Sequence, residues 1–536
     1  MPKVWKTLPQ QSDDLIGQLL VNRLIKTEKQ REIFFNPSLG DFEMELKISG
    51  IEASLKRIHR AIDKGELIII YGDFDVDGIC ATTILYKGLT SLGAKVLPYI
   101  PHREKEGYGL SKVGLEFARD SGAGVIITVD NGIVAFDEAK YAKELGLDLI
   151  ITDHHIPLDK KPAAFSIVHS TDMCGAAVAW CLIQEEINKN LAQDLLQFVA
   201  VATVADLIPL VGLNRCFVKS GLKQLNKTTN IGLKSLILES KLTLGEIGSY
   251  EIGHIIAPRL NAIGRLEHAI DAVRLLCTKD LQKAARLSKL LSDTNTLRQK
   301  MTIEALEEAR LMVSKKERIH ILDSKNWSMG IIGLIAGRVC EEYSTPAIAI
   351  SVGETISKGS ARSINGINIV ETIRQCSDIL IGIGGHPGAA GFSIANENIP
   401  VFKKRLAKLA LKFPWGEEPV LEIEAQIPTK NITRTLVKDL EKFEPFGLGN
   451  PKPVFATYGL KISDIKTVGL GKHLKFKVAD PERSRGIEGI DAIAFGMGNW
   501  AELLKPGQLI DVAYYLELNK FNGSEKLQLK VKDIKI

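Results

Sequence analysis

Three aspartates follow an apolar run in the stretch LIIIYGDFDVDGIC, which covers residues 67–80. Asp73, Asp75 and Asp77 stand at every second position after the run, and Gly78 ends the cluster. Like charges so close together repel one another, and burial would penalise each of them further. The cluster therefore needs positively charged partners. Carboxylate oxygens are ligands that suit Mg²⁺ and Mn²⁺.

Two more polar clusters end similar apolar runs. AGVIITVDNG reaches Asp130, and LDLIITDHH ends with Asp153, His154 and His155. Helix-like stretches such as VAFDEAKYAKELG lie between the runs, and this alternation predicts a parallel sheet covered on both faces. Ligands of such sheets bind outside the carboxyl ends of the strands, so the three clusters should converge on one edge. The histidines favour Mn²⁺ over Mg²⁺. The number of carboxylates favours two ions rather than one, and such a pair would activate water and hold a phosphate in place.

Each motif alone has a simpler interpretation. DFDVDG by itself also fits a polar turn or a calcium loop, and only the matching strand ends VDNG and TDHH favour a metal phosphoesterase. Asp206 interrupts the apolar run FVAVATVADLIPL. Taken alone, it fits a helix cap or a buried ion pair as well as it fits a metal ligand.

The composition is that of an ordinary soluble multidomain protein. At 536 residues the chain predicts two to four domains, and a net charge of +5 makes any basic surface a local one. The seven scattered cysteines contain no CxxC pair, which indicates reduced core residues rather than a disulfide framework or a zinc site. Neither a secretion signal nor an apolar membrane-spanning segment is expected.

Changes of pattern along the chain divide it into five segments of a multidomain α/β fold. A helical N-terminal region is expected, followed by a parallel-sheet catalytic domain, a long charged connector helix, a second α/β domain and a C-terminal oligonucleotide-binding (OB-type) β-barrel. The expected ranges, in that order, are 1–50, 51–278, 279–317, 318–415 and 416–536.

The predicted barrel carries a basic run, LKISDIKTVGLGKHLKFKV, in which five lysines stand against the single acid Asp464. Phe476 and Phe521 could stack on bases of a single strand, as in other barrels of this kind, or could fill the barrel core. The lysines are Lys461, Lys466, Lys472, Lys475 and Lys477.

Taken together, the motifs resemble those of a known family. DFDVDG, VDNG and TDHH are similar to the signature motifs of the DHH phosphoesterase superfamily, and NWSMGIIGLIAGRV, KGSARS and GIGGHPGAAG resemble its DHHA1 companion domain. APRLNAIGRL and EPFGLGNPKPVF resemble the bacterial RecJ branch in particular. The resemblance is collinear over nearly the whole chain. Phe74 stands where the family commonly has Tyr, and Thr152 where it commonly has Ser.

The resemblance implies a metal-dependent 5′→3′ exonuclease specific for single-stranded DNA. Such an enzyme hydrolyses phosphodiester bonds by two-metal activation of water and releases 5′-mononucleotides in DNA repair and recombination. The implied cofactors are two divalent ions, Mn²⁺ or Mg²⁺. The implied partners are single-stranded DNA, a single-strand-binding protein and a RecQ-type helicase. A monomer is expected in the bacterial cytoplasm, associated with the nucleoid during repair and not with a membrane.

The resemblance also assigns roles to residues by their place in the motifs. The implied metal ligands are Asp73, Asp75, Asp77, Asp130, His154, His155 and Asp206. For His155 the alternative is contact with the scissile phosphate, and for Asp73 it is a place behind the ligands. The implied ligands, Asp73 excepted, form the implied catalytic set together with His386. The implied substrate-binding residues are Arg103, Arg265, Ser360, Arg362 and His386, because guanidinium groups and a hydroxyl can grip a phosphate.

The sequence has to be weighed against two other functions. A small-substrate DHH phosphatase or short-oligonucleotide nuclease would share the metal motifs, but such relatives are shorter and lack the barrel. A binding scaffold that has lost its metal site would have lost some of the acids and histidines, which are intact here. No Ser or Cys stands beside a suitable base, which disfavours a covalent intermediate.

Overall fold

The computed structural model describes residues 3–103, 106–314, 316–413, 419–481, 489–521 and 524–536. The chain forms two compact units. One unit comprises Lys47–Asp206 and Gly221–Glu417, and the other comprises Met1–Leu46, Leu207–Ser220 and Glu418–Ile536. Within these described ranges, none of the helices combines the length and apolar character needed to cross a membrane.

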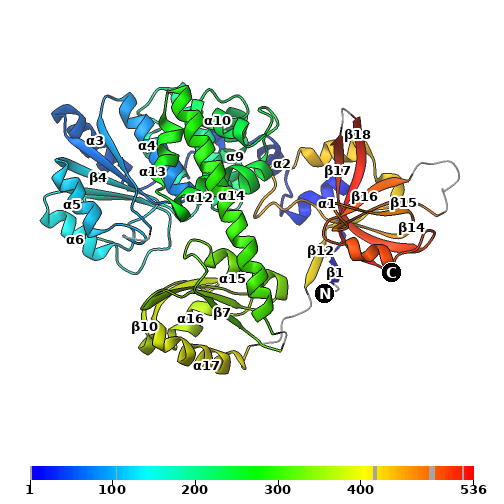
Figure 1. Cartoon of the computed structure of the whole chain (residues 1–536). Helices are drawn as coiled ribbons and strands as arrows, with labels where there is room; N and C mark the ends of the chain where they lie inside the picture. Colours follow the sequence, from blue (N-terminus) through cyan, green and yellow to red (C-terminus); the bar gives the residue numbers. More distant parts are fainter. Residues whose placement is uncertain (1–2, 104–105, 315, 414–418, 482–488, 522–523) are drawn as a thin grey trace. The chain divides into compact units, whose positions relative to one another are not determined.

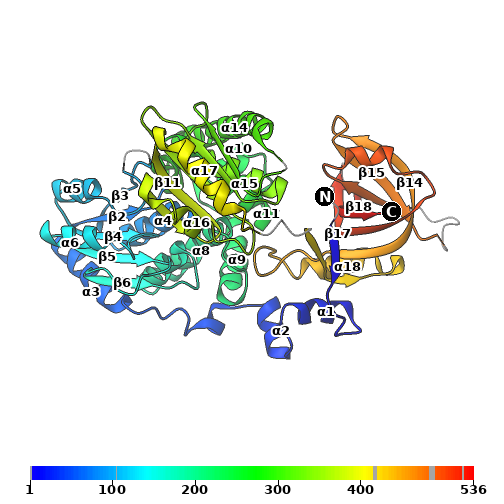
Figure 2. The same cartoon turned by 90° about the horizontal axis from the view of Figure 1, so that it is seen from below.

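The first sheet of the larger unit has five parallel strands in the order β3-β2-β4-β5-β6, which Figure 2 shows side by side. Ile68, Ile69, Ile70 and Tyr71 of β2 are fully buried, which explains why this strand reads as a continuous apolar run. The predicted parallel sheet is confirmed. Its strands are β2 (Leu67–Gly72), β3 (Lys95–Tyr99), β4 (Ala123–Val129), β5 (Asp148–Asp153) and β6 (Ser166–His169).

Helices cover this sheet. Helices α5 (Lys112–Asp120) and α6 (Phe136–Glu144) pack on β4 and β5 in one apolar cluster. Helices α3 (Ile51–Lys64), α4 (Val76–Ser91) and α7 (Gly175–Ile183) also pack on its strands. Strand β2 lies between β3 and β4, so the strand order reverses at its carboxyl end, which is where ligands bind in sheets of this type.

A helical layer follows and leads to the second sheet. It contains α8 (Lys189–Ala205), α10 (Ile231–Glu239), a π-helical turn η2 (Ile252–Ile256), α12 (Ala257–Leu266) and α13 (Ile270–Cys277). The predicted connector is α14 (Leu281–Met312), a single helix of 32 residues that Figure 1 shows running from these helices to the second sheet.

The second sheet has five strands in the order β10-β11-β9-β8-β7. The glycine-rich GIGGHPGAAG, which resembles a DHHA1 motif, forms the hairpin of β10 and β11. Strand β11 pairs on both sides, so its backbone N–H groups are engaged in the sheet. The elements are β7 (His320–Ser324), α15 (Ile332–Tyr343), β8 (Ala347–Ser351), β9 (Ile356–Arg362), α16 (Ile369–Arg374), β10 (Leu380–His386), β11 (Ala389–Ala395) and α17 (Ile399–Ala410).

The smaller unit is built on a six-stranded sheet in the order β13-β14-β15-β16-β18-β17, and pairing of β14 with β17 closes it. This closure agrees with the predicted barrel. Phe476 is 1% exposed and belongs to the barrel core, so it cannot be a stacking platform, and the side chain of Phe521 lies outside the described residues. The strands are β13 (Ala425–Gln426), β14 (Phe455–Val468), β15 (His473–Ala479), β16 (Ile490–Ala494), β17 (Leu509–Phe521) and β18 (Ser524–Lys535).

The N-terminal segment differs from the helical region expected for residues 1–50. It starts with strand β1 (Val4–Thr7), which pairs in parallel with β12 (Val420–Ile423). Leu19 and Leu20 of α1 (Leu15–Asn22) join the apolar core of the barrel. This pairing joins residues more than 400 positions apart, and local sequence periodicity carries no signal of such a contact.

Candidate metal and phosphate cleft

The three aspartates of the opening stretch are fixed by the start of α4. Asp75 is the N-cap, and its Oδ1 accepts hydrogen bonds from the N–H groups of Asp77 (2.9 Å) and Gly78 (3.1 Å). A Cβ at Gly78 would overlap the backbone of Asp73, so only glycine permits this tight turn. The turn between β2 and α4 therefore brings the three carboxyl groups close together at the end of β2.

All seven residues expected to bind metal lie together at the carboxyl edge of the first sheet. Their ligand atoms form three overlapping groups, each with its members within 4.8 Å of one another. His154 Nε2 lies 3.1 Å from Asp130 Oδ1, 3.6 Å from Asp77 Oδ2 and 3.7 Å from Asp206 Oδ2. The groups are Asp130–His154–His155, Asp77–His154–Asp206 and Asp73–Asp75–Asp130.

Backbone contacts position the other acids. Asp77 accepts hydrogen bonds from the N–H groups of Gly175 (2.6 Å) and Ala176 (2.7 Å) at the start of α7. Asp130 follows β4 with a φ of 62°, in the left-handed region that Asp and Asn tolerate better than most residues. Asp206 ends α8 as its C-cap. Elements far apart in sequence thus deliver one carboxylate each.

The carboxyl groups of the cluster resist ionisation when no cation is bound. Burial, followed by repulsion from Asp75, raises the pKa of Asp73 well above its ordinary value. Burial and repulsion from Asp206 raise the pKa of Asp77. Burial and repulsion from Asp77 raise the pKa of Asp130. Burial and Asp75 raise the pKa of Asp206 to about 7. A bound cation would reverse this balance.

The two histidines differ in charge. Burial and the neighbouring His155 lower the pKa of His154 to about 4, so its imidazole is neutral and available as a ligand at neutral pH. Burial opposes the charge of His155, but a 2.7 Å hydrogen bond to Asp153 Oδ1 outweighs it and raises the pKa to about 9. The hydroxyl of Tyr108 lies 2.9 Å from His155 Nε2.

The donor set fits divalent cations. Oδ1 of Asp73 and Oδ1 of Asp130 are buried, and neither accepts a hydrogen bond from a described residue, although His154 Nε2 lies 3.1 Å from Asp130 Oδ1. Buried carboxylate oxygens are seldom left without a partner, and one that lacks it indicates an ion or water. Carboxylates with one or two imidazoles suit Mn²⁺ and Mg²⁺.

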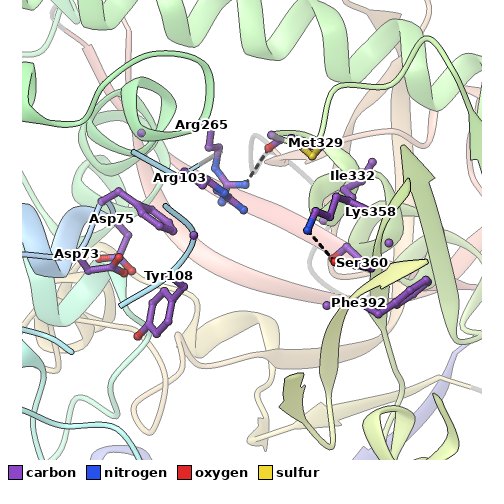
Figure 3. A pocket seen from close by; sticks show the side chains of 18 of the residues that line it. Asp73, Asp75, Arg103, Tyr108, Arg265, Met329, Ile332, Lys358, Ser360 and Phe392 are labelled. Atoms are coloured by element: carbon purple, nitrogen blue, oxygen red, sulfur yellow. Dashed lines mark hydrogen bonds between the residues drawn. The ribbon is translucent and has the colours of Figure 1, made fainter. Parts of the chain in front are cut away.

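A cleft of about 810 Å³ opens beside this cluster (Figure 3). Asp73, Asp75 and Tyr108 lie on one side of it, and Lys358 and Ser360 of β9 lie on the opposite side. Arg103, Arg265 and Arg362 also line the cleft. A carboxylate wall therefore faces a wall of cationic and hydroxyl groups within one unit.

Positive charges lie close together on the cationic wall. Burial, followed by repulsion from Arg103, Arg298 and Arg362, lowers the pKa of Arg265 to about 10. Burial likewise lowers the pKa of Arg362, whose Nη1 donates to Ser360 Oγ at 3.3 Å. Clustered guanidinium groups repel one another unless an anion lies between them, and phosphate offers the oxygens that they bind best.

Family comparisons agree with the geometry. Residues 67–203 match the DHH family N-terminal domain, residues 312–412 the DHHA1 domain, and residues 423–533 the RecJ OB domain. The single-stranded-DNA-specific exonuclease RecJ of Bacillus subtilis is 36% identical, over 97% of this chain and 67% of its own length. RecJ of Thermus thermophilus is 32% identical, over 91% of this chain and 72% of its own length.

The chain belongs to the RecJ family.

Solved structures of RecJ proteins share this architecture. The crystal structure of Thermus thermophilus RecJ in complex with Mn²⁺ has a TM-score of 0.85 and 27% identity, and covers 99% of this chain and 79% of its own. The crystal structure of exonuclease RecJ bound to manganese has a TM-score of 0.63 and 33% identity, over 69% of this chain and 96% of its own. The predicted RecJ resemblance and multidomain α/β fold are confirmed.

His386, a further predicted site residue, belongs to the second sheet. His386 ends β10, is exposed, and accepts a 3.2 Å hydrogen bond from the N–H of Gly388 through Nδ1. It does not belong to the residues that line the cleft. Its roles in catalysis and substrate binding stay predictions.

Sequence reasoning missed several polar residues of the cleft. Lys358 lies two positions before Ser360 on the same face of β9, and its Nζ donates to Ser393 Oγ at 2.7 Å. The two-residue alternation of a strand could have revealed it. Asn261 and Tyr108 also line the cleft. Asn261 stands one helical turn before Arg265, a spacing that places both on one helix face.

Proposed function

We propose that this chain is a metal-dependent exonuclease that hydrolyses single-stranded DNA from the 5′ end and releases 5′-mononucleotides. The observation that carries the proposal is the cleft itself, which Asp73 and Asp75 of the acid and histidine cluster line together with Ser360, Arg265 and Arg362. The names of the relatives, single-stranded-DNA-specific exonucleases, agree with it.

Two divalent ions, Mn²⁺ or Mg²⁺, are the proposed cofactors. Asp77, His154 and Asp206 would hold one, and Asp73, Asp75 and Asp130 the other, with His155 beside the shared Asp130. When bound, such ions lower the pKa of water and stabilise negative charge on a phosphate undergoing displacement. Crystal structures of Thermus thermophilus RecJ with Mn²⁺ and with Mg²⁺ support this choice.

The remaining residues of the cleft bind and orient the strand. Arg265, Arg362 and Ser360 hold the terminal 5′ phosphate, because an end carries more negative charge than an internal phosphodiester. Arg103, whose guanidinium lies 5.1 Å from the ring centroid of Phe74, adds positive charge to the cleft. Asp153 and Tyr108 fix the ring of His155 through its two nitrogens.

The barrel presents a second surface suited to a single strand. The cross-strand register places Lys466, Lys475, Ile493, Lys530 and Tyr515 in one row across five strands. The row borders a cavity of about 630 Å³ lined by Phe495, Tyr515, Lys530 and Lys532, among others.

Lysine and aromatic groups alternate at this cavity. Lys530 Nζ lies 5.6 Å from the ring centroid of Phe495, and Lys532 Nζ lies 5.0 Å from that of Tyr515. Phe495 is 52% exposed, unlike Phe476. We therefore assign base stacking to Phe495 and Tyr515, with backbone contacts from the neighbouring lysines.

The biological setting belongs to the same proposal. The 5′→3′ polarity, the role in DNA repair and recombination, and recruitment by a single-strand-binding protein and a RecQ-type helicase rest on the family resemblance. So do the monomeric state and action in the cytoplasm at the nucleoid.

The test uses the purified chain with Mn²⁺ or Mg²⁺. Oligonucleotides labelled at the 5′ or the 3′ end are supplied as single strands and as blunt duplexes. The proposal expects 5′-labelled mononucleotide as the first product from single strands, and no product without a divalent ion. Shortening from the 3′ end, or equal rates on duplex, would contradict it.

A further inference from the structure

Helix α12 contacts both walls of the cleft. Oδ1 of Asn261 accepts a 3.1 Å hydrogen bond from the N–H of Val76, which stands between Asp75 and Asp77. One turn later, Nη1 of Arg265 donates to the carbonyl oxygen of Gly330 at 3.1 Å, in the segment that leads into α15. One short helix thus bridges the metal-binding loop and the second α/β domain.

Close backbone packing makes this bridge stiff. A Cβ at Gly264 would overlap the carbonyl oxygen of Phe74, and a Cβ at Gly330 would overlap the carbonyl oxygen of Arg265. No side chain can therefore lie between α12 and its neighbour at either point. Direct backbone contact leaves little room for one wall to shift relative to the other.

Asn261 completes the cap of α4. The first N–H groups of a helix have no partner within the helix. Asp75 satisfies those of Asp77 and Gly78, while Asn261 satisfies that of Val76 from a different helix. The Asn261 side chain thereby holds the loop that carries Asp73, Asp75 and Asp77, although it belongs to none of the candidate metal groups.

The separation of the two walls has a consequence for the product. If an enzyme binds a terminal phosphate at one site and cleaves the strand at another, the distance between the two sites sets the length of the released fragment. We propose that α12 fixes this distance, with Asn261 as the positioning residue, and so sets the length of the released nucleotide. The inference rests on the proposed binding of the 5′ phosphate in the same cleft.

The test compares three variants. Asn261→Leu removes the acceptor, Asn261→Asp keeps an acceptor oxygen of the same shape, and Asn226→Leu is the matched control. Asn226 Oδ1 accepts the N–H of Ile247 at 2.8 Å, the same kind of bond between distant segments, but Asn226 does not line the cleft. Thermal melting establishes that each variant is folded.

The first readout is product length on a uniformly labelled, 5′-phosphorylated single strand. In Asn261→Leu, turnover should fall about 10- to 100-fold, as for a small misplacement of reacting groups, and dinucleotides and longer products should appear. Asn261→Asp should restore the wild-type product length while raising KM, because its charge repels phosphate. Asn226→Leu should match the wild type in both respects.

The second readout needs no DNA. The affinity of the DNA-free chain for Mn²⁺, measured by calorimetry, should fall about 10-fold or more in Asn261→Leu, and Asn226→Leu should leave it unchanged. If Asn261→Leu does not fold, Gly264→Ala replaces it, since the added methyl group pushes α12 away from Phe74.

The outcomes separate this inference from the proposed function. Wild-type product length in a folded Asn261→Leu or Gly264→Ala variant, or an equal shift in Asn226→Leu, would overturn the role of α12. A wild-type chain that binds Mn²⁺ but ignores 5′ ends would instead overturn the proposed function, and the role of α12 in product length with it.

Discussion

Nε2 of His154 lies 3.1 Å from Oδ1 of Asp130, although the two residues follow different strands of the sheet. The contact is not an ion pair at neutral pH, because burial and His155 lower the pKa of His154 to about 4. A neutral imidazole beside a buried carboxylate is a usual arrangement for two ligands of one cation. Removing the charge of Asp130 therefore tests the metal site directly.

Asp130→Asn should reduce hydrolysis at least about 100-fold, because a catalytic ion supplies several kcal/mol of transition-state stabilisation. Asn tolerates the left-handed backbone of this position, so the fold should survive. Without metal the variant should melt no lower than the wild type, since an amide replaces a carboxyl group that burial and Asp77 keep from ionising. Single-strand affinity should persist.

Melting curves with and without Mn²⁺ check this prediction alongside steady-state rates. Mn²⁺ should raise the melting temperature of the wild type more than that of Asp130→Asn. The matched control is Asp137→Asn, an exposed acid in the first turn of α6. Equal stabilisation of both variants by Mn²⁺, with full turnover, would remove Asp130 from the metal site.

Arg362→Ala should lose most of the preference for 5′-phosphorylated over 5′-hydroxyl single strands. Its rate on the phosphorylated substrate should fall about 10- to 100-fold, or roughly 1.4–2.8 kcal/mol, because the two-pronged guanidinium contact is lost. Arg362→Lys should recover only part of this preference, since a lysine cannot make the two parallel hydrogen bonds of a guanidinium to phosphate.

Kinetics on matched 5′-phosphate and 5′-hydroxyl oligonucleotides measure the effect. Arg338→Ala is the control, because Arg338 lies on α15 of the same domain and pairs with Glu341 at the surface. If Arg362→Ala keeps the wild-type ratio of the rates on the two substrates, Arg362 does not bind the 5′ phosphate, and Arg103 becomes the next candidate.

Lys530→Ala combined with Lys532→Ala should weaken binding to long single strands and reduce its salt dependence. Each phosphate contact contributes about 0.7 to the slope of log K against log salt for single strands, so the slope should fall by about 1.4. Cleavage of short oligonucleotides should persist, because the metal site belongs to the other unit.

Fluorescence titrations at several salt concentrations give that slope. The double variant Lys438→Ala with Lys442→Ala, on α18 (Arg434–Glu441) and its C-cap, is the control. Deleting the barrel from residue 420 onward is a poorer test, because it would expose Leu19 and Leu20. If both double variants show the same slope of log K against log salt, the Phe495–Tyr515 surface does not bind the single strand.

Arg23→Met should destabilise the smaller unit by about 3–5 kcal/mol, because it leaves the buried Glu424 carboxylate without its partner. Arg23 Nη1 lies 2.6 Å from Glu424 Oε2, and their side chains are 6% and 8% exposed. Urea unfolding measures the change. Arg31→Met, which breaks only the exposed pair with Glu28, should cost less than about 1 kcal/mol.

The metal site followed from the sequence because its signal is local. Each ligand cluster directly follows a buried, β-branched run, and parallel strands bring such ends to one edge. The order of the strands and the turn at Gly78 then place Asp73, Asp75 and Asp77 within reach of Asp130 and His154. Local pattern and general rules of sheet topology sufficed for these three clusters, whereas Asp206 was assigned only through the family resemblance.

Other features required the tertiary structure because they depend on contacts between distant segments. Strand β1 pairs with β12, and Asn261 caps a helix that begins 185 residues earlier. Whether an aromatic ring faces the core or the solvent is decided by register, since neighbouring residues of a strand point to opposite sides. Phe476 therefore lies inside the barrel and Phe495 outside, which composition alone does not determine.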